Sequence, residues 1–177
     1  IASAVSSGEV DNATLVSLFA VDTDRARSLA EHVAPSALVT SDIDAFLSPA
    51  PLQLVIECAS PDAVRAHAKT VLSNGKDLLL MSSGALTDSA LFPALAGPAE
   101  QQRCRFMVPS GALGGIDAIR GVRRHLTKVT RTTTKAPRSL QGAPGFMVWE
   151  TRGMSEGQVI LEGPAVEAVK VCPANVN

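Results

Sequence analysis

A glycine-rich stretch, VPSGALGGIDAI over residues 108–119, has the composition of a loop that could hold a ligand. Three glycines and one serine fall within six residues, directly after a short apolar run that predicts a buried strand. Because glycine has no Cβ, Gly111 and the glycines after it let the backbone approach a bound molecule closely or adopt a positive φ. Ser110 adds a hydroxyl group at the same place. The alternative interpretation is a tight turn between two domains.

Small or polar residues also follow three other runs that predict strands. These loops are Asp22-Thr23-Asp24, Cys58-Ala59-Ser60 and Ser82-Ser83-Gly84. In a parallel sheet, the loops that follow the strands share the carboxyl edge, which is where ligands bind in such folds. Small side chains in these loops leave room for a flat ligand.

The elements expected to position these loops alternate between strands and helices. Strands are predicted at residues 14–21, 37–40, 52–58, 77–81 and 105–108, and helices at residues 1–8, 25–33, 41–47, 62–73 and 87–95. This alternation indicates an α/β fold with a parallel sheet and right-handed crossovers.

After Gly121 the pattern changes, and we predict a domain boundary there. Strands are expected at residues 126–135, 146–149 and 158–162, a loop-rich segment at residues 137–157, and a short helix at residues 165–171. The chain thus divides into residues 1–121 and 122–177.

The composition limits the classes of partner. The chain has 177 residues, is 46% hydrophobic and carries a net charge of −1, which indicates a globular protein that does not bind nucleic acid or membranes. Cys58, Cys104 and Cys172 lie far apart, each in or after an apolar run. They predict reduced core thiols in an intracellular, cytoplasmic protein.

Metal and hydrolase chemistry are disfavoured. None of His32, His67 and His125 lies in a short motif with metal-ligand spacing. Ser110 lacks the G-x-S-x-G context of a nucleophile elbow. A basic group could hold a dicarboxylate or could be a solvated face; its members are Arg120, Arg123, Arg124, Lys128, Arg131 and Lys135.

Dinucleotide binding normally begins with a G-x-G-x-x-G turn after the first strand, and that turn does not occur in this chain. Residues 1–8 fit the helix that would follow it, which makes residues 14–21 the second strand. An acid is expected at the end of that strand, but Ala20 and Val21 occupy the closest positions. Asp22 is then either a helix N-cap or a ribose ligand. Discrimination between NAD and NADP is expected to be relaxed.

The stretch PSGALGGIDAI at residues 109–119 resembles the signature loop of the L-aspartate dehydrogenase family. Four further blocks are similar to that family in the same order: LVIECASPDAV at residues 54–64, GKDLLLMSSGAL at 75–86, TTTKAP at 132–137 and LEGPAVEAVKVCPANVN at 161–177. Five blocks in order make the resemblance far more specific than one glycine-rich loop.

The resemblance implies a Rossmann-type parallel sheet, with its first strand missing, followed by the start of a smaller α+β catalytic domain. Residues 1–121 would be an NAD(P)-binding domain truncated at its N-terminus. Residues 122–177 would begin a substrate and catalytic domain truncated at its C-terminus.

The resemblance also implies an activity, the oxidative deamination of L-aspartate to iminoaspartate with NAD or NADP. By similarity, Ala112 and Asn177 would contact the cofactor near its nicotinamide end. Other cofactor contacts are expected from Gly111, Asp22 and the loop residues Cys58, Ala59, Ser60, Ser82, Ser83 and Gly84. Lys135 and Ser110 are expected to meet the substrate carboxylates.

The departures from the family lead to further expectations. The phosphate-binding glycines would lie before Ile1 and the acid–base histidine beyond Asn177, so no catalytic residue is named in this chain. We expect the chain alone to be inactive and the complete protein to be a homodimer. The alternatives are a non-catalytic remnant, or a related reductase for another amino-dicarboxylate or a semialdehyde. Residues 141–157 exceed the family's usual connection and have no assigned role.

Overall fold

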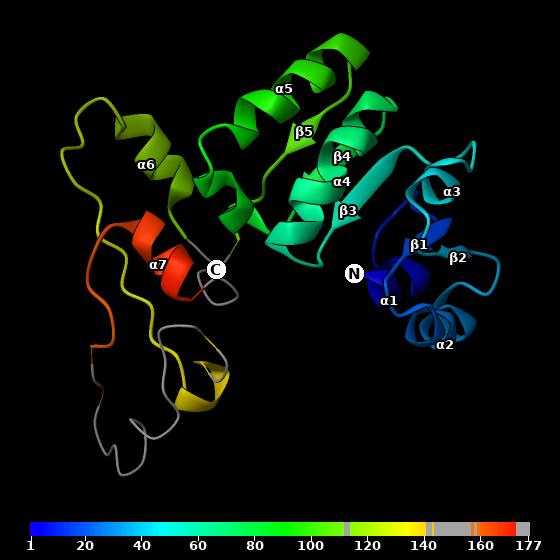
Figure 1. Ribbon diagram of the computed structural model, residues 1–177, viewed down its shortest axis with the longest axis horizontal. Helices are drawn as coiled ribbons and strands as arrows, with labels where there is room; N and C mark the ends of the chain where they lie inside the picture. The colour runs from blue at the N-terminus through cyan, green and yellow to red at the C-terminus, as the bar shows by residue number, and fades with distance from the viewer. Residues whose placement is uncertain (112–113, 141–142, 144–156, 158, 173–177) are drawn as a thin grey trace. The chain divides into compact units, whose positions relative to one another are not determined.

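The computed structural model describes residues 1–111, 114–140, 143, 157 and 159–172 (Figure 1). The chain divides into two compact units. The first comprises Ile1–Ile56, His67–Leu79 and Leu95–Phe106; the second comprises Glu57–Ala66, Leu80–Ala94 and Met107–Asn177. No helix in the described ranges has the length and apolar character that crossing a bilayer requires.

A parallel pair of strands with two helices forms the start of the first unit. Strand β1 (Ser17–Phe19) pairs with β2 (Leu38–Thr40), with Ser17 opposite Leu38 and Phe19 opposite Thr40. Helix α2 (Thr23–Val33) connects these strands, and α3 (Ile43–Leu47) follows them. Each helix begins at an aspartate N-cap: Asp22 Oδ1 accepts from the Arg25 N–H at 3.0 Å, and Asp42 Oδ1 accepts from the Asp44 N–H at 2.8 Å. The N-cap interpretation of Asp22 is therefore confirmed.

The first helix ends at a glycine close to its predicted end. Helix α1 (Ala2–Ser6) is closed by Gly8, which has a φ of +77°. The Gly8 N–H donates to the Val5 carbonyl and the Glu9 N–H donates to the Ala4 carbonyl, a Schellman arrangement that satisfies the last carbonyls of the helix.

The second sheet contains three strands in the order β3–β4–β5. Strand β3 (Leu54–Glu57) leads through α4 (Pro61–Ser73) to β4 (Asp77–Leu80), and α5 (Leu91–Gln102) leads to β5 (Phe106–Met107). The ladder keeps a constant offset: the Asp77 N–H donates to Gln53 O and the Met81 N–H donates to Glu57 O, both at 2.9 Å. This is the pattern of parallel neighbours. The predicted α/β class is confirmed, but in the described residues the single parallel sheet of the prediction is divided into a two-stranded and a three-stranded sheet.

The main apolar face of α4 follows its helical period. Val64, Ala68, Val71 and Leu72 are 0–3% exposed, at spacings that place them on one side of the helix. Leu78 and Leu80 of β4 are equally buried. In the first unit, the ring of Phe19 makes edge contacts with Phe46 and with His67 of α4, with centroids 5.7 Å and 4.9 Å away. His67 is thus a packing residue.

The helix predicted at residues 87–95 lies further along the chain. Ser83–Thr87 forms a 3₁₀ turn (η1), and α5 runs from Leu91 to Gln102 with Pro98 inside it. Proline lacks one N–H, but Leu95 and Ala99, four residues apart, are both buried on the face that α5 turns inward. Burial of that face outweighs the missing hydrogen bond, so the helix continues past Pro98 although proline usually ends a helix.

An ion pair joins the starts of β4 and β5. Asp77 Oδ1 accepts from the Arg105 N–H at 2.6 Å, and Asp77 Oδ2 accepts from Arg105 Nε at 2.8 Å and Nη2 at 2.6 Å. These bonds, the backbone N–H first, hold the pKa of Asp77 below its ordinary value of 3.8. Its side chain is only 18% exposed.

We expect Asp77→Asn to lower the free energy of unfolding by about 1 kcal/mol at pH 7. A lowered pKa in the folded state stabilises the fold above the ordinary carboxyl pKa, and this contribution is lost as the pH falls from that value through the lowered one. The gap between wild type and variant should therefore shrink below about pH 4. Urea unfolding at pH 7 and pH 3 measures this gap. Asp24→Asn, at an exposed pair with Arg27, is the control and should change little at either pH. A gap that does not depend on pH would contradict the assignment.

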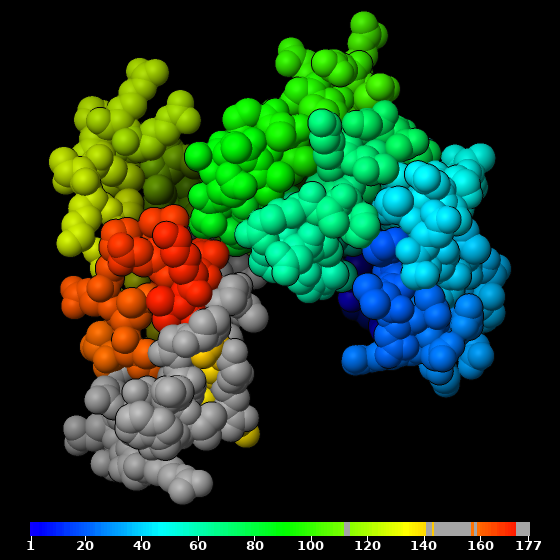
Figure 2. Space-filling view, viewed as in Figure 1, coloured from blue at the N-terminus to red at the C-terminus, as the bar shows by residue number. Residues whose placement is uncertain are grey.

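The second unit continues with α6 (Ile116–Val122), a 3₁₀ turn η2 (Pro137–Leu140) and α7 (Ala165–Val171). The helix predicted at residues 165–171 is confirmed. The strand predicted at residues 126–135 is wrong, because that segment pairs with no other described strand, and the same holds for residues 159–162. Residues 120–139 are all exposed, and the first of them belong to the yellow-green surface in Figure 2. The strand predicted at residues 146–149 lies outside the described residues.

Candidate functional site

Three of the predicted loops lie at the carboxyl ends of adjacent strands. Cys58–Ser60 follows β3, Ser82–Gly84 follows β4, and the glycine-rich stretch follows β5. Because β4 lies between the other two strands, the three loops leave one edge of this sheet in consecutive order. All three loops belong to the second unit.

A side chain that sequence reasoning missed holds two of these loops. Glu57, the last residue of β3, accepts four hydrogen bonds through its carboxylate. Oε1 accepts from the Ala59 N–H at 2.8 Å, the Ser60 N–H at 3.1 Å and the Ser82 hydroxyl at 2.9 Å. Oε2 accepts from the Ser82 N–H at 2.9 Å. One carboxylate therefore ties the loop after β3 to the loop after β4. The available signal was an acid at the end of an otherwise apolar strand and directly before small residues.

The side chains of Ser60 and Ser82 bind the protein's own atoms. Ser60 Oγ accepts from the Ala63 N–H at 3.2 Å, which caps α4. The Ser82 hydroxyl is bound to Glu57, and the Ser83 N–H donates to the Met81 carbonyl at 2.9 Å. The buried Gly84 accepts through its carbonyl from the Thr87 hydroxyl at 2.8 Å. The hydroxyl groups of Ser60 and Ser82 are thus already engaged within the protein.

The glycine-rich stretch has the conformations that require glycine. Gly111 has a φ of +61° and Gly115 a φ of +77°, both in the left-handed region. Gly115 is also the N-cap of α6, and its carbonyl accepts from the Ile119 N–H at 3.0 Å. Ser110 and Gly111 are exposed, whereas Ala112 lies outside the described residues.

The remaining predicted site residues are placed separately. Asp22 is the N-cap of α2, three residues after β1, in the first unit, and Lys135 lies in the exposed segment of the second. Asn177 lies outside the described residues. No group of three metal-ligating side chains occurs in the part of the chain that the structure describes.

The cysteines are free thiols, as predicted, but they are not all in the core. Cys58 is exposed, and Cys104 and Cys172 are partly buried. Cys104 Sγ donates to the Leu72 carbonyl at 3.5 Å, and burial, followed by the nearby Asp77 carboxylate, raises the pKa of the Cys104 thiol. The prediction of three core thiols is therefore wrong for Cys58, because it follows the last residue of its strand.

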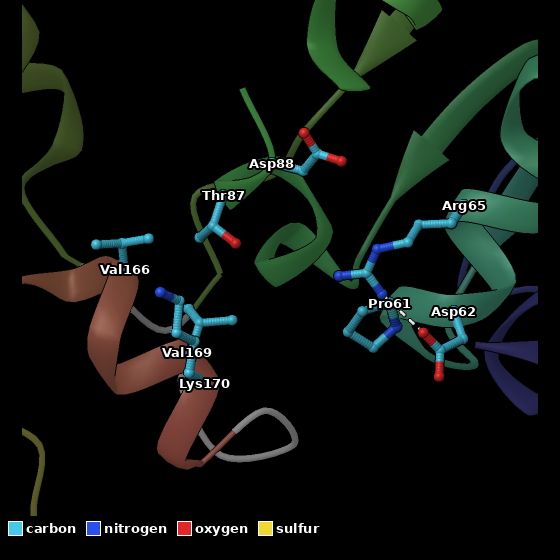
Figure 3. Close-up of a pocket in the computed structure, with 8 residues that line it drawn as sticks. All are labelled: Pro61, Asp62, Arg65, Thr87, Asp88, Val166, Val169 and Lys170. Atoms are coloured by element: carbon cyan, nitrogen blue, oxygen red, sulfur yellow. Dashed lines mark hydrogen bonds and ion pairs between the residues drawn. The ribbon is translucent and has the colours of Figure 1, made fainter. Parts of the chain in front are cut away.

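A cavity of about 410 Å³ lies within the second unit (Figure 3). Its lining comes from the first turns of α4, from η1 with the residue after it, and from α7: Pro61, Asp62, Arg65, Thr87, Asp88, Val166, Val169 and Lys170. Arg65 pairs with Asp62 at 2.7 Å across one turn of α4. None of the predicted site residues lines this cavity. The lining contains two acidic and two basic side chains, and parts of it follow directly on the loops after β3 and β4.

Comparison with known proteins matches the two parts of the chain to two family models. Residues 1–109 match the family model described as homoserine dehydrogenase, NAD binding domain, and residues 117–177 match the model described as aspartate dehydrogenase, C-terminal. The chain is 34% identical to an L-aspartate dehydrogenase of Methanocaldococcus jannaschii over 171 residues, covering 96% of this chain and 63% of the relative. It is 36% identical to one of Methanosarcina mazei over 177 residues, covering 98% and 64%.

A further relative and a solved structure are also aspartate dehydrogenases. An L-aspartate dehydrogenase of Nitrosopumilus maritimus is 38% identical over 134 residues, covering 75% of this chain and 49% of the relative. The chain thus spans about half to two thirds of the length of these relatives. The crystal structure of an aspartate dehydrogenase from Thermotoga maritima has the same fold, with a TM-score of 0.66 and 23% identity over 93% of this chain and 69% of that one. The chain belongs to the L-aspartate dehydrogenase family, and its residues 1–109 form an NAD-binding domain of the homoserine dehydrogenase type.

Proposed function

We propose that the protein containing this chain oxidises L-aspartate to iminoaspartate with NAD⁺ or NADP⁺ as the hydride acceptor. The observation that carries the proposal is the succession of two family models, an NAD-binding domain and an aspartate dehydrogenase C-terminal part, along one chain. Hydride leaves Cα of the amino acid, a proton leaves its nitrogen, and the products are the imine and the reduced cofactor. The bound nicotinamide supplies the redox chemistry, and the protein supplies placement and electrostatics.

The cofactor would lie along the edge formed by the loops after β3, β4 and β5. Backbone atoms of Cys58–Ser60, Ser82–Gly84 and Gly111 would contact it, with Ala112 and Asn177 at the nicotinamide end. The order of these strands and the use of the serine side chains inside the protein support this placement. We assign no general acid or base to the described residues.

We infer that the enzyme accepts both NAD and NADP. Ala20 and Val21 stand where an acid would hold the ribose of NAD, and Asp22 already uses Oδ1 to cap α2. A carboxylate bound to the start of a helix is less available to repel a 2′-phosphate. Any contact of Asp22 with the ribose would use its other carboxylate oxygen.

For the substrate, we infer that Lys135 and Ser110 meet its carboxylates. Both residues are exposed, and the lysine is a point charge suited to a carboxylate. The change of domain is placed near Gly121, supported by the boundary of the two family models between residues 109 and 117. A homodimer in the cytoplasm is the expected form, and the free thiols Cys58, Cys104 and Cys172 are consistent with a reducing compartment.

The activity is tested with the protein expressed from its whole coding region. We expect reduction of NAD⁺ or NADP⁺ that depends on L-aspartate, followed by absorbance of the reduced cofactor. D-Aspartate and L-glutamate serve as controls and should give at most about a hundredth of the rate. D-Aspartate has the opposite configuration at Cα and L-glutamate has a longer spacing between its carboxylates, so a site shaped for L-aspartate would misplace both. No rate above background with L-aspartate would overturn the proposal.

L-Homoserine belongs in the same panel, because residues 1–109 match a domain model named for homoserine dehydrogenase. A rate with L-homoserine that exceeds the rate with L-aspartate would favour an enzyme of the semialdehyde class. No rate with any member of the panel would favour a non-catalytic remnant.

A further inference from the structure

The Glu57 carboxylate is bound entirely by neutral donors. It accepts from three backbone N–H groups and one hydroxyl group, and in the described part of the chain no lysine or arginine forms an ion pair with it. Glu57 is only partly exposed. A partly buried carboxylate is stabilised by several donors at once, and its removal would leave those donors without a partner. The arrangement therefore fixes the two loops more firmly than local turns would.

These hydrogen bonds also set the direction of the loop peptides. In a planar trans peptide, the N–H and the C=O point in opposite directions, and the described residues contain no cis peptide bond. Because the N–H groups of Ala59 and Ser60 point at Glu57, the carbonyl groups of Cys58 and Ala59 point away from it. Both of these residues are exposed. The outer surface of this loop is thus rich in hydrogen-bond acceptors.

Most N–H groups at the start of α4 are used by the protein as well. Helix N-termini bind phosphate through free N–H groups. Here the Ser60 N–H donates to Glu57, Pro61 has no N–H, and the Ala63 N–H donates to Ser60 Oγ. A negative charge, that of Glu57, already lies at this positive end of the helix. This part of the edge is therefore unsuited to phosphate.

We propose that Glu57 is a positioning residue that turns the loop after β3 into an acceptor surface for the nicotinamide riboside end of the cofactor. Carbonyl oxygens accept from ribose hydroxyl groups and from a carboxamide, both neutral donors, and they repel phosphate. The inference rests on the proposed function, because it takes this edge as the cofactor site. It adds a residue and a chemical preference that the fold alone does not specify.

The test is Glu57→Gln in the protein expressed from its whole coding region. The glutamine has nearly the same shape, but its NH₂ group faces a backbone N–H or a hydroxyl in place of accepting from it. We expect KM for NAD⁺ to rise about tenfold, which is the effect of losing one to two such hydrogen bonds. KM for L-aspartate should stay within about twofold. Ser82→Ala removes one of the four donors and should raise KM for NAD⁺ only about twofold.

The matched control is Asp62→Asn, which removes an exposed carboxylate from the first turn of the same helix. Its KM for NAD⁺ should equal that of the wild type. Hydrogen exchange of the Ala59, Ser60 and Ser82 amides should accelerate in Glu57→Gln and not in Asp62→Asn, which shows that the variant folds and that the loops are released.

ADP, an inhibitor that lacks the nicotinamide riboside, separates the two ends of the cofactor. Its inhibition constant should be the same for wild type and Glu57→Gln. An equal weakening of ADP and NAD⁺ would overturn the proposal, because the loops would then hold the adenosine or phosphate part. Faster amide exchange with an unchanged KM for NAD⁺ would also overturn it, because Glu57 would then serve structure alone.

A failure of the proposed reaction is recognised separately. If the wild type does not oxidise L-aspartate, NADH and ADP are titrated calorimetrically into wild type and Glu57→Gln. Weaker NADH binding in the variant with unchanged ADP binding then supports the role of Glu57 without the reaction. Equal NADH binding by the two proteins contradicts it.

Discussion

Leu72→Ala is expected to lower the free energy of unfolding by about 3 kcal/mol or more. Leu72 lies near the end of α4 and is 0% exposed, and its neighbours on the buried face, Val64 and Ala68, are also inaccessible to solvent. The substitution removes the transfer free energy of the lost methyl and methylene groups and leaves a cavity that rigid neighbours fill only in part. Urea unfolding followed by circular dichroism measures the loss.

Leu29→Ala is the matched control for this prediction. Leu29 lies on α2 and is 44% exposed, so the same chemical change removes little buried surface. Its effect should stay below about 1 kcal/mol, since alanine also has the better helix propensity. If both variants lost the same stability, Leu72 would not be the packing residue that its burial indicates.

The two adjacent glycines after β5 should respond differently to alanine. Gly115 has a φ of +77°, so Gly115→Ala places a Cβ in the left-handed region and should lower stability by about 1–2 kcal/mol. Gly114 has no such φ, and a Cβ added there meets no described atom within 4 Å. Gly114→Ala should therefore leave the free energy of unfolding unchanged or slightly higher.

Cofactor binding then separates the two interpretations of this loop. If a nicotinamide ring lies against the backbone at Gly114, the added methyl group enters its space, and KM for NAD⁺ should rise about tenfold or more. If the stretch is only a turn, Gly114→Ala is silent in both measurements. Urea unfolding and KM together therefore decide whether this stretch is only a turn or is a surface against which the nicotinamide ring lies.

Local signals predicted the helix ends well. Asp22 is an N-cap, as one of its two interpretations predicted, and Asp42 caps α3 in the same way. Gly8 and Gly75, both with positive φ, follow α1 and α4 within two residues of the predicted helix ends. Caps act through hydrogen bonds within one turn of the chain, so the residues that make them are adjacent in the sequence. The same locality explains why α7 was predicted with its exact bounds.

Predictions that needed a distant partner were less successful. The alternating segment at residues 126–135 has the pattern of a strand, but it has no described strand beside it, and alternation alone does not make a ladder. Helix α5 continues through Pro98 because burial of Leu95 and Ala99 outweighs one missing hydrogen bond. Neither outcome is encoded within a few residues.

For the candidate site, too, some features were predicted from the sequence and others were not. Alternating strands and helices were enough to predict that the loops after β3, β4 and β5 share an edge, because right-handed crossovers leave few other arrangements. The sequence did not show what these loops do with their polar groups. Ser60, Ser82 and the amides beside them look like ligand contacts in the sequence, yet their hydrogen bonds are made to the protein.

By itself, the sequence determined the α/β class, the caps and the family, since five ordered blocks and a helix–strand alternation are properties of the linear chain. Only the tertiary structure decided the role of Glu57, which binds Ser82 across 25 residues, and of Asp77, which binds Arg105 across 28 residues. The physical reason is that a carboxylate finds its donors through the register of the sheet. That register brings the ends of β3 and β4 together, and no spacing along the chain specifies it.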